Sequence, residues 1–376
     1  MQSMTRLQAL LKPLAKSDVD RLARSEGVQR YGKGALTVWD QLLVMLYGQF
    51  VQAPSLRAAL ESFNAHAAHL GALQTHELRR STLSDGNRRA GAAQVPSQVL
   101  QGLIRQLQGC RDKRMLGAVS LIDSTPLTLK GRGFDAWTRG TKTRRTQGVK
   151  VHVQCDAATH AVSRCEISPP NVNDVVQARQ WEIAPGTTCV FDRAYCDYAW
   201  WARMTRQGTK FVTRLKRNAG MDVLEALPVP EAARGHILDD ERVSRRWRHP
   251  RSGQTWHEPL VLRRIRLRTD DARLLVLVTN DFERSALEIG ALYRSRWQIE
   301  LLFKWMKQHL ALRRIWGTNE HAAHLQIYAA FIAHVLLMLH RQASRCTFDL
   351  WGLLQRWRYG LFEPCEPDLR PAGQPP

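Results

Sequence analysis

No apolar run in the sequence is long enough to cross a bilayer. The longest, residues 327–339, is well short of the roughly 20 residues that a spanning helix needs, and His334 interrupts it. We interpret this run as a buried core helix, and we expect no membrane partner. The first residues lack the apolar core and cleavage site of a signal peptide. We therefore expect a cytoplasmic protein.

Cysteine pairs and hydrolase motifs are also missing. The seven cysteines are scattered, odd in number, and form no CxxC pair. Neither a disulfide framework nor a zinc ribbon is expected from such a pattern. No nucleophile elbow or matching triad pattern is present, which disfavours hydrolysis by serine or cysteine.

Acidic residues are scarce relative to basic ones. The 376 residues include 55 Lys and Arg but 34 Asp and Glu, which gives a formal charge of +21. A surplus of this size points to a polyanionic partner, and DNA or RNA is the commonest. On charge alone, a ribosome-associated or anionic-membrane protein is the alternative. The apolar share of 44% excludes a disordered tail and suits two or three globular domains.

Residues 1–110 show helical patterns. Thr37 can cap a helix over residues 38–50, which is apolar all round and therefore buried. Another helix begins near Ser55. Four arginines, at positions 79, 80, 88 and 89, flank a helix start at Ser81 or Thr82. A DNA contact and a solvated charged face are about equally expected there.

Strand patterns begin near residue 116. Residues 116–122 and 188–191 are short apolar runs, and residues 149–155 alternate and are followed by a partner strand. Hairpins followed by strand–helix–strand crossovers predict a mixed α/β sheet. Arginine-rich, alternating residues 217–270 predict a β-rich insertion.

A long helix is expected after this insertion and a resumed strand. Ser285 and Glu288 fit a capping box, and the helix should run to about Leu310. The proline-rich end after Glu363 is expected to be loose. The predicted segments are a helical N-terminal DNA-binding domain at 1–110, a catalytic core at 111–216 and 271–345, the insertion at 217–270, and a C-terminal tail at 346–376.

Two aspartates directly follow predicted strands. Asp123 comes after residues 116–122, and Asp192 after residues 188–191. Such residues lie at the edge of a sheet, where α/β active sites gather. For either residue alone, capping of the next turn is the commoner role.

One face of the long helix carries four polar residues. Tyr293, Arg296, Glu300 and Lys307 are spaced by three, four and seven residues. At about 100° per residue they share a stripe roughly 60° wide. Apolar residues beside the stripe would anchor the helix on the sheet; they are Leu292, Ile299, Leu302, Phe303 and Met306. The alternative is an ion-pair ladder on a solvated helix.

The three acids together suit two-metal phosphoryl transfer. That reaction needs about three carboxylates around hard cations some 4 Å apart. The basic residues of the stripe would hold nearby phosphates, and Arg296 could bind two oxygens at once.

The sequence resembles the DDE transposases of bacterial insertion sequences, specifically the IS-four family. That family has a helix with Tyr, two residues, Arg, three residues, Glu, six residues and Lys, and the residues from Tyr293 to Lys307 match every spacing. The blocks LIDSTPL and VFDRAYCDYAWW are similar to the family's two aspartate blocks. The likeness spans most of residues 30–340.

The resemblance implies a ribonuclease-H-like core with a β-rich insertion and a helical N-terminal domain. It implies two Mg²⁺ ions, replaceable by Mn²⁺, held by Asp123, Asp192 and Glu300. It implies cut-and-paste chemistry at terminal inverted repeats and target DNA, by a homodimer in the synaptic complex at the nucleoid. The expected DNA contacts are Tyr293, Arg296, Lys307, Arg193 and Lys150.

Hairpin formation and two competing functions stay open. Some relatives form a DNA hairpin and stack a flipped base on a tryptophan in the strand before the helix that carries the glutamate. In this sequence, the corresponding residues 272–280 include no aromatic residue. Trp247 or Trp256 could stack a base instead, or could pack the core of the insertion. A ribonuclease-H-like nuclease and a transposase-derived DNA-binding protein without activity are the competing functions.

Overall fold

The computed structural model describes residues 3–28, 35–109, 118–129, 131–138, 147–216, 219–246, 259–269 and 271–365. The chain forms two compact units. The helical unit comprises residues 1–111, 127–149 and 303–376, and the sheet unit comprises residues 112–126 and 150–302. The division of the chain into five functional segments remains a prediction.

Helices dominate the helical unit, as the sequence predicts for residues 1–110. Its N-terminal elements are α1 (Arg6–Leu11), α2 (Lys16–Ser25), α3 (Val38–Phe50), α4 (Leu56–Asn64), α5 (Ala67–Leu70), η1 (Gly71–Leu73), α6 (Arg80–Asn87) and α7 (Gln94–Gly109). Later segments add η2 (Arg132–Phe134), α12 (Glu320–Ser344) and α13 (Leu350–Arg358). Helix α13 buries Leu353, Leu354 and Trp357, so residues 350–358 form a packed helix.

Local signals account for several helix starts. Thr37 and Asp40 form a reciprocal capping box at the start of α3, every residue of which is buried. Ser55 caps α4. Helix α6 begins at Arg80, slightly before the predicted start, and its N-cap Arg79 makes no side-chain cap.

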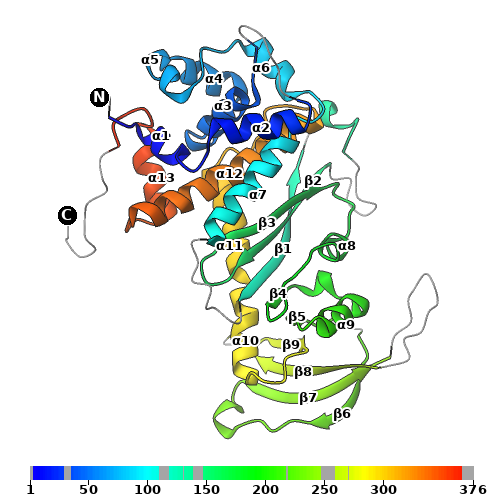
Figure 1. Cartoon of the computed structure of the whole chain (residues 1–376). Helices are drawn as coiled ribbons and strands as arrows, with labels where there is room; N and C mark the ends of the chain where they lie inside the picture. The colour runs from blue at the N-terminus through cyan, green and yellow to red at the C-terminus, as the bar shows by residue number, and fades with distance from the viewer. Residues whose placement is uncertain are drawn as a thin grey trace. The chain divides into compact units, whose positions relative to one another are not determined.

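Helix α12 forms the centre of the helical unit and packs against α7 and α3 (Figure 1). Among the described helices, it alone is long and apolar enough to span a membrane, but 83% of its apolar window is buried inside the protein. Length and composition are therefore weak grounds for a membrane span here.

A nine-stranded mixed sheet, in the order β3-β2-β1-β4-β5-β9-β8-β7-β6, forms the second unit (Figure 1). Its strands are β1 (Val119–Thr128), β2 (Gly148–Asp156), β3 (Val162–Ser168), β4 (Thr188–Phe191), β5 (Lys210–Arg214), β6 (Asp222–Ala226), β7 (Ile237–Arg245), β8 (Leu260–Arg268) and β9 (Leu274–Thr279). Strand β4 pairs in parallel with β1 on one side and with β5 on the other, whereas the pairs β2–β3, β5–β9, β9–β8, β8–β7 and β7–β6 are antiparallel. This arrangement confirms the predicted mixed α/β sheet.

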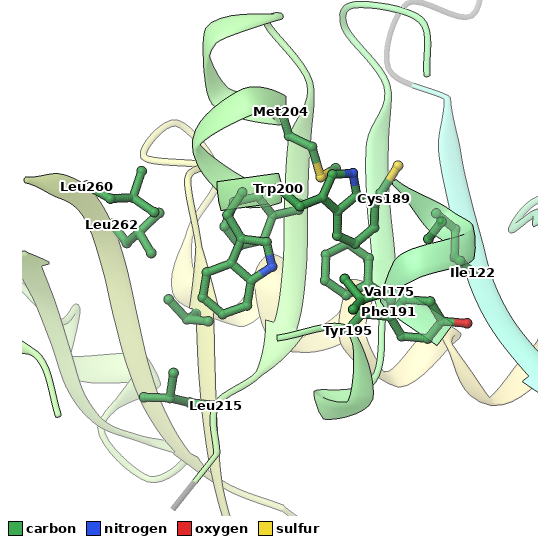
Figure 2. Packing of buried hydrophobic residues seen from close by; sticks show 14 of the residues in the cluster. Ile122, Val175, Cys189, Phe191, Tyr195, Trp200, Met204, Leu215, Leu260 and Leu262 are labelled. Atoms are coloured by element: carbon green, nitrogen blue, oxygen red, sulfur yellow. The ribbon is translucent and has the colours of Figure 1, made fainter. Parts of the chain in front are cut away.

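Short helical segments connect the parallel strands and cover the sheet. They are α8 (Asp174–Ala178), η3 (Arg193–Tyr195) and α9 (Tyr198–Arg206). Trp200 of α9 packs on Phe191 of β4 with ring centroids 4.9 Å apart (Figure 2). Gly208, with a positive φ of 71°, then turns the chain into β5. This apolar cluster holds β1 and β4 in place next to the predicted acids.

The predicted insertion is β-rich, and its strands continue the main sheet. Strands β8, β7 and β6 lie beyond β9 in that order, and the short η4 (Glu231–Ala233) lies between β6 and β7 in the sequence. A buried ion pair joins β7 to β8, with Arg263 Nη2 2.6 Å from Asp240 Oδ2. The insertion therefore extends one edge of the sheet that carries the acids.

The single long helix predicted after Ser285 is wrong in one respect. The capping box of Ser285 and Glu288 is present, but the chain forms α10 (Ala286–Ser295) and α11 (Trp297–His309), with Arg296 between them. Ser295 Oγ donates to Leu292 O, and the backbone N–H of Arg296 donates to Tyr293 O. Serine hydroxyls that bond back to a carbonyl of the preceding turn often bend a helix.

Candidate active site

The parallel strands bring the two predicted aspartates together. The β1–β4 ladder pairs Val119 with Thr188 and continues to Ile122 opposite Phe191. Asp123 and Asp192 are the next residues on the two strands, so they lie at the same level of the sheet. The sequence predicts that Asp123 follows the end of its strand. Strand β1 instead continues to Thr128, but Asp123 does follow Ile122, the last residue of β1 that pairs with β4.

Backbone amides orient both carboxylates. Asp123 Oδ1 accepts a hydrogen bond of 2.8 Å from the N–H of Ser124. Asp192 caps η3, and its Oδ1 accepts a 2.7 Å bond from the N–H of Ala194. In each case one carboxylate oxygen is held by the backbone.

Arg296 bridges Glu300 and Asp123. Its Nη1 lies 2.6 Å from Glu300 Oε1 and 3.5 Å from Asp123 Oδ2. The exposed fractions of the side chains are 17% for Arg296, 18% for Asp123 and 35% for Glu300. A helix glutamate and a strand aspartate thus share one guanidinium at the edge of the core.

The site destabilises negative charge on Asp123. Burial, together with the charges of Asp192 and Glu300, raises the pKa of Asp123 to about 7, although the N–H of Ser124 and Arg296 oppose the shift. Burial is also the main cause of a raised pKa at Asp192. Three converging acids with one guanidinium favour an additional cation.

These donors fit divalent cations, because carboxylate oxygens are the ligands that Mg²⁺ and Mn²⁺ prefer. Within the part of the chain that the structure describes, no three His, Cys, Asp or Glu side chains are close enough as they stand to hold a metal ion. Arg296 Nη1 contacts both Asp123 and Glu300, so the guanidinium occupies the space between these two carboxylates.

Tyr293 and Arg193 lie close to the acids. The guanidinium of Arg296 lies 5.7 Å from the centroid of the Tyr293 ring. Burial raises the pKa of Tyr293, and the charge of Asp192 adds to the shift. Arg193 directly follows Asp192 and is exposed.

The two predicted lysines have different surroundings. Lys150 Nζ lies 3.0 Å from Asp174 and 2.8 Å from Val172 O, so its charge is already paired. Lys307 is half-buried on the part of α11 that belongs to the helical unit, and burial lowers its pKa. Trp247 and Trp256 lie outside the described residues.

Asp174 lies beside the site, although the sequence patterns do not predict this. This residue opens α8 in the sheet unit, and its carboxylate contacts β1 and β2. Asp174 and the preceding Asn173 are residue types that commonly open a helix, and this place also suits an ordinary first-turn acid.

A mixed sheet whose parallel strands present two aspartates to a helix glutamate is the architecture of a ribonuclease-H-like catalytic core. The same fold occurs in a piggyBac transposase synaptic complex with hairpin DNA, at a TM-score of 0.54 and 10% identity. That match covers 95% of this chain and 80% of the other chain. At this identity, the likeness concerns the fold alone.

Sequence comparison identifies the family. Residues 115–336, more than half of the chain, match the family described as "Transposase DDE domain", and residues 2–73 match a domain of unknown function. A protein of Sinorhizobium fredii named as a transposase is 36% identical over 71% of this chain and 73% of its own length. A Geobacillus stearothermophilus protein, named as a probable transposase for an insertion sequence element, is 26% identical over 92% of this chain and 88% of its own length. The chain belongs to the DDE-domain transposases, a family of enzymes.

Proposed function

We propose that this protein is the transposase of an insertion-sequence element, and that it cuts DNA at the terminal inverted repeats and joins the ends to target DNA. The observation that carries the proposal is the convergence of Asp123, Asp192 and Glu300 around Arg296. The formal charge of +21 suits a DNA partner. A homodimer that synapses two ends, acting at the nucleoid in the cytoplasm, is part of the same proposal.

The three acids are proposed as the ligands of two Mg²⁺ ions. These ions, when bound, supply the Lewis acidity and charge neutralisation that phosphodiester cleavage and strand transfer need. The remaining tasks fall to the chain. The backbone amides of Ser124 and Ala194 hold one oxygen of each aspartate and leave the other carboxylate oxygen to face the reaction.

Arg296 has donors to spare for a phosphate. Its Nε is buried without a hydrogen-bond partner, while its Nη1 serves both Glu300 and Asp123. A planar guanidinium can bind two phosphate oxygens at once. We infer that Arg296 turns from the carboxylates to the DNA backbone when cations and the end are bound. Tyr293, Arg193 and Lys307 are proposed as further phosphate contacts.

The test is Mg²⁺-dependent cleavage of a duplex that carries the DNA flanking this gene, comparing the wild type with Asp192→Ala. We expect the wild type alone to cut at the repeat boundary. Specific binding without cutting by either protein would favour a DNA-binding protein without activity. Cutting by both would show that Asp192 is not in the site, and cutting that ignores the repeats would indicate a structure-specific nuclease.

A further inference from the structure

A fourth carboxylate, that of Asp174, connects one helix to two strands next to the proposed catalytic site. Asp174 Oδ1 accepts a 2.6 Å hydrogen bond from Ser124 Oγ on β1 and lies 3.0 Å from Lys150 Nζ on β2. Asp174 itself is the first residue of α8, and 18% of its side chain is exposed. One shielded carboxylate therefore links α8 to both strands.

This link reaches Asp123 through one residue. The N–H of Ser124 donates to Asp123 Oδ1, while the hydroxyl of Ser124 donates to Asp174. Ser124 is thus held on both sides, and its backbone amide sets the direction of the Asp123 carboxylate. The charge of Asp174 also reaches Asp192, where it contributes to the raised pKa.

Lys150 is the cation that balances Asp174. His152 Nδ1 lies 3.7 Å from Asp174, but burial lowers the pKa of His152 to about 4, so this imidazole is neutral near pH 7. His152 Nε2 is instead paired with Ser168 Oγ at 2.8 Å. Asp174 therefore neutralises the positive charge of Lys150, which would otherwise repel a divalent cation in the neighbouring site.

A role confined to the end of α8 does not explain these contacts. Asn173 already caps this helix, with its Oδ1 accepting from the N–H of Val175 at 3.2 Å. Asp174 directs its carboxylate to β1 and β2, away from the amides of its own helix. Asn173 therefore caps the helix, whereas Asp174 contacts the strands, so a substitution at Asn173 is a matched control for one at Asp174.

We propose that Asp174 is a positioning residue for the cation site: it holds Ser124 so that Asp123 faces the cations, and it neutralises Lys150. The inference rests on the proposed function of the three acids. Groups that orient metal ligands in this way typically change metal affinity by roughly 10–100-fold when removed.

The experiment measures binding of Mn²⁺ alone to the full chain by calorimetry, with the melting temperature of each variant recorded alongside. We expect Asp174→Ala and Ser124→Ala each to weaken Mn²⁺ binding roughly tenfold. The double variant should bind Mn²⁺ only slightly more weakly than the single variant with the lower affinity, because each single substitution already removes the hydrogen bond between Ser124 and Asp174. Asp174→Asn, which keeps an acceptor for Ser124 but frees the charge of Lys150, should fall between wild type and Asp174→Ala.

The control is Asn173→Ala, which should lower the melting temperature and leave Mn²⁺ binding unchanged. If Asp174→Ala and Ser124→Ala also keep wild-type Mn²⁺ affinity, the inference is wrong. Should Asp174→Ala fail to fold, Ser124→Ala still decides, since it removes only one hydroxyl. Asp123→Asn separates the two proposals: unchanged Mn²⁺ binding in that variant overturns the proposed site itself, whereas lost binding there with normal binding in Ser124→Ala overturns only the role of Asp174.

Discussion

The inserted strands and the parallel strands of the same sheet use acidic residues in opposite ways. Between β7 and β8, acids face arginines across the ladder: Asp240 pairs with Arg263 at 2.6 Å, and Glu241 with Arg264 at 2.7 Å. Beside the parallel strands, Asp123 of β1 and Glu300 of α11 share the single guanidinium of Arg296. Matched charges hold strands together, whereas a surplus of carboxylates leaves capacity for added cations.

We expect the largest effect on DNA cleavage from removing one of the three carboxylates of the proposed cation site. Glu300→Gln should reduce strand cleavage to background and leave binding of the DNA end largely intact, because this carboxylate is proposed to hold cations and not DNA. Cleavage assays and gel-shift titrations on the same end duplex measure the two properties. Strong residual cutting would remove Glu300 from the site.

A matched pair in the insertion should respond in stability. Asp240→Ala leaves Arg263 buried, with only 7% of its side chain exposed, and without its carboxylate. Breaking a buried ion pair on one side typically costs about 3–5 kcal/mol in the free energy of unfolding. Urea denaturation measures the loss, and the cleavage rate per folded molecule should not change.

The control for this pair is the exposed pair of Asp271 and Arg273, whose side chains are 53% and 83% exposed. Asp271→Ala should therefore destabilise the protein far less than Asp240→Ala, because solvent screens an exposed pair. Equal losses in the two variants would mean that burial does not distinguish these pairs.

What the sequence could predict was local. The caps at Thr37 and Ser285 depend on residues within one turn, and the order of apolar runs placed Asp123 and Asp192 after buried strand residues. These parts of the fold needed no knowledge of distant contacts.

The features that were missed depend on residues distant in the sequence. Arg296 interrupts the predicted helix, and its guanidinium contacts Asp123, 173 positions away. Asp174 contacts Ser124, 50 positions away. The pairing of β8 with β9 is likewise a tertiary choice, since alternating residues show that a strand forms but not which edge it joins.

The excess of carboxylates in the proposed site should also make cation binding depend on pH. Because the pKa of Asp123 is raised from 3.8 to about 7, this carboxyl is mostly protonated at pH 6 and mostly ionised at pH 8. A cation competes with that proton, so Mn²⁺ should bind more weakly at pH 6 than at pH 8. Without cations, the sign for stability is opposite: the raised pKa stabilises the folded protein at low pH, and this stabilisation is lost as the pH rises from about 4 to 7.

Asp123→Asn tests the pH dependence of stability, and the wild type tests the pH dependence of Mn²⁺ binding. This variant cannot ionise at position 123, so its melting temperature should lose this component of the pH dependence. Calorimetric Mn²⁺ titrations at the two pH values test the binding trend in the wild type. A wild-type affinity that does not change between pH 6 and pH 8 would contradict the assignment of the titrating group.

The smallest expected effect concerns the basic side of the comparison. If Lys307 makes one phosphate contact, Lys307→Ala should weaken end binding and lower the slope of log affinity against log salt by about one. Lys210→Ala is the matched control, because Lys210 is already held by Glu283 at 2.6 Å and Asp281 at 3.2 Å. Both variants remove one positive charge, so overall charge predicts equal changes, whereas a specific contact predicts a change for Lys307 alone. An unchanged slope for Lys307→Ala would assign this half-buried lysine to the packing of α11.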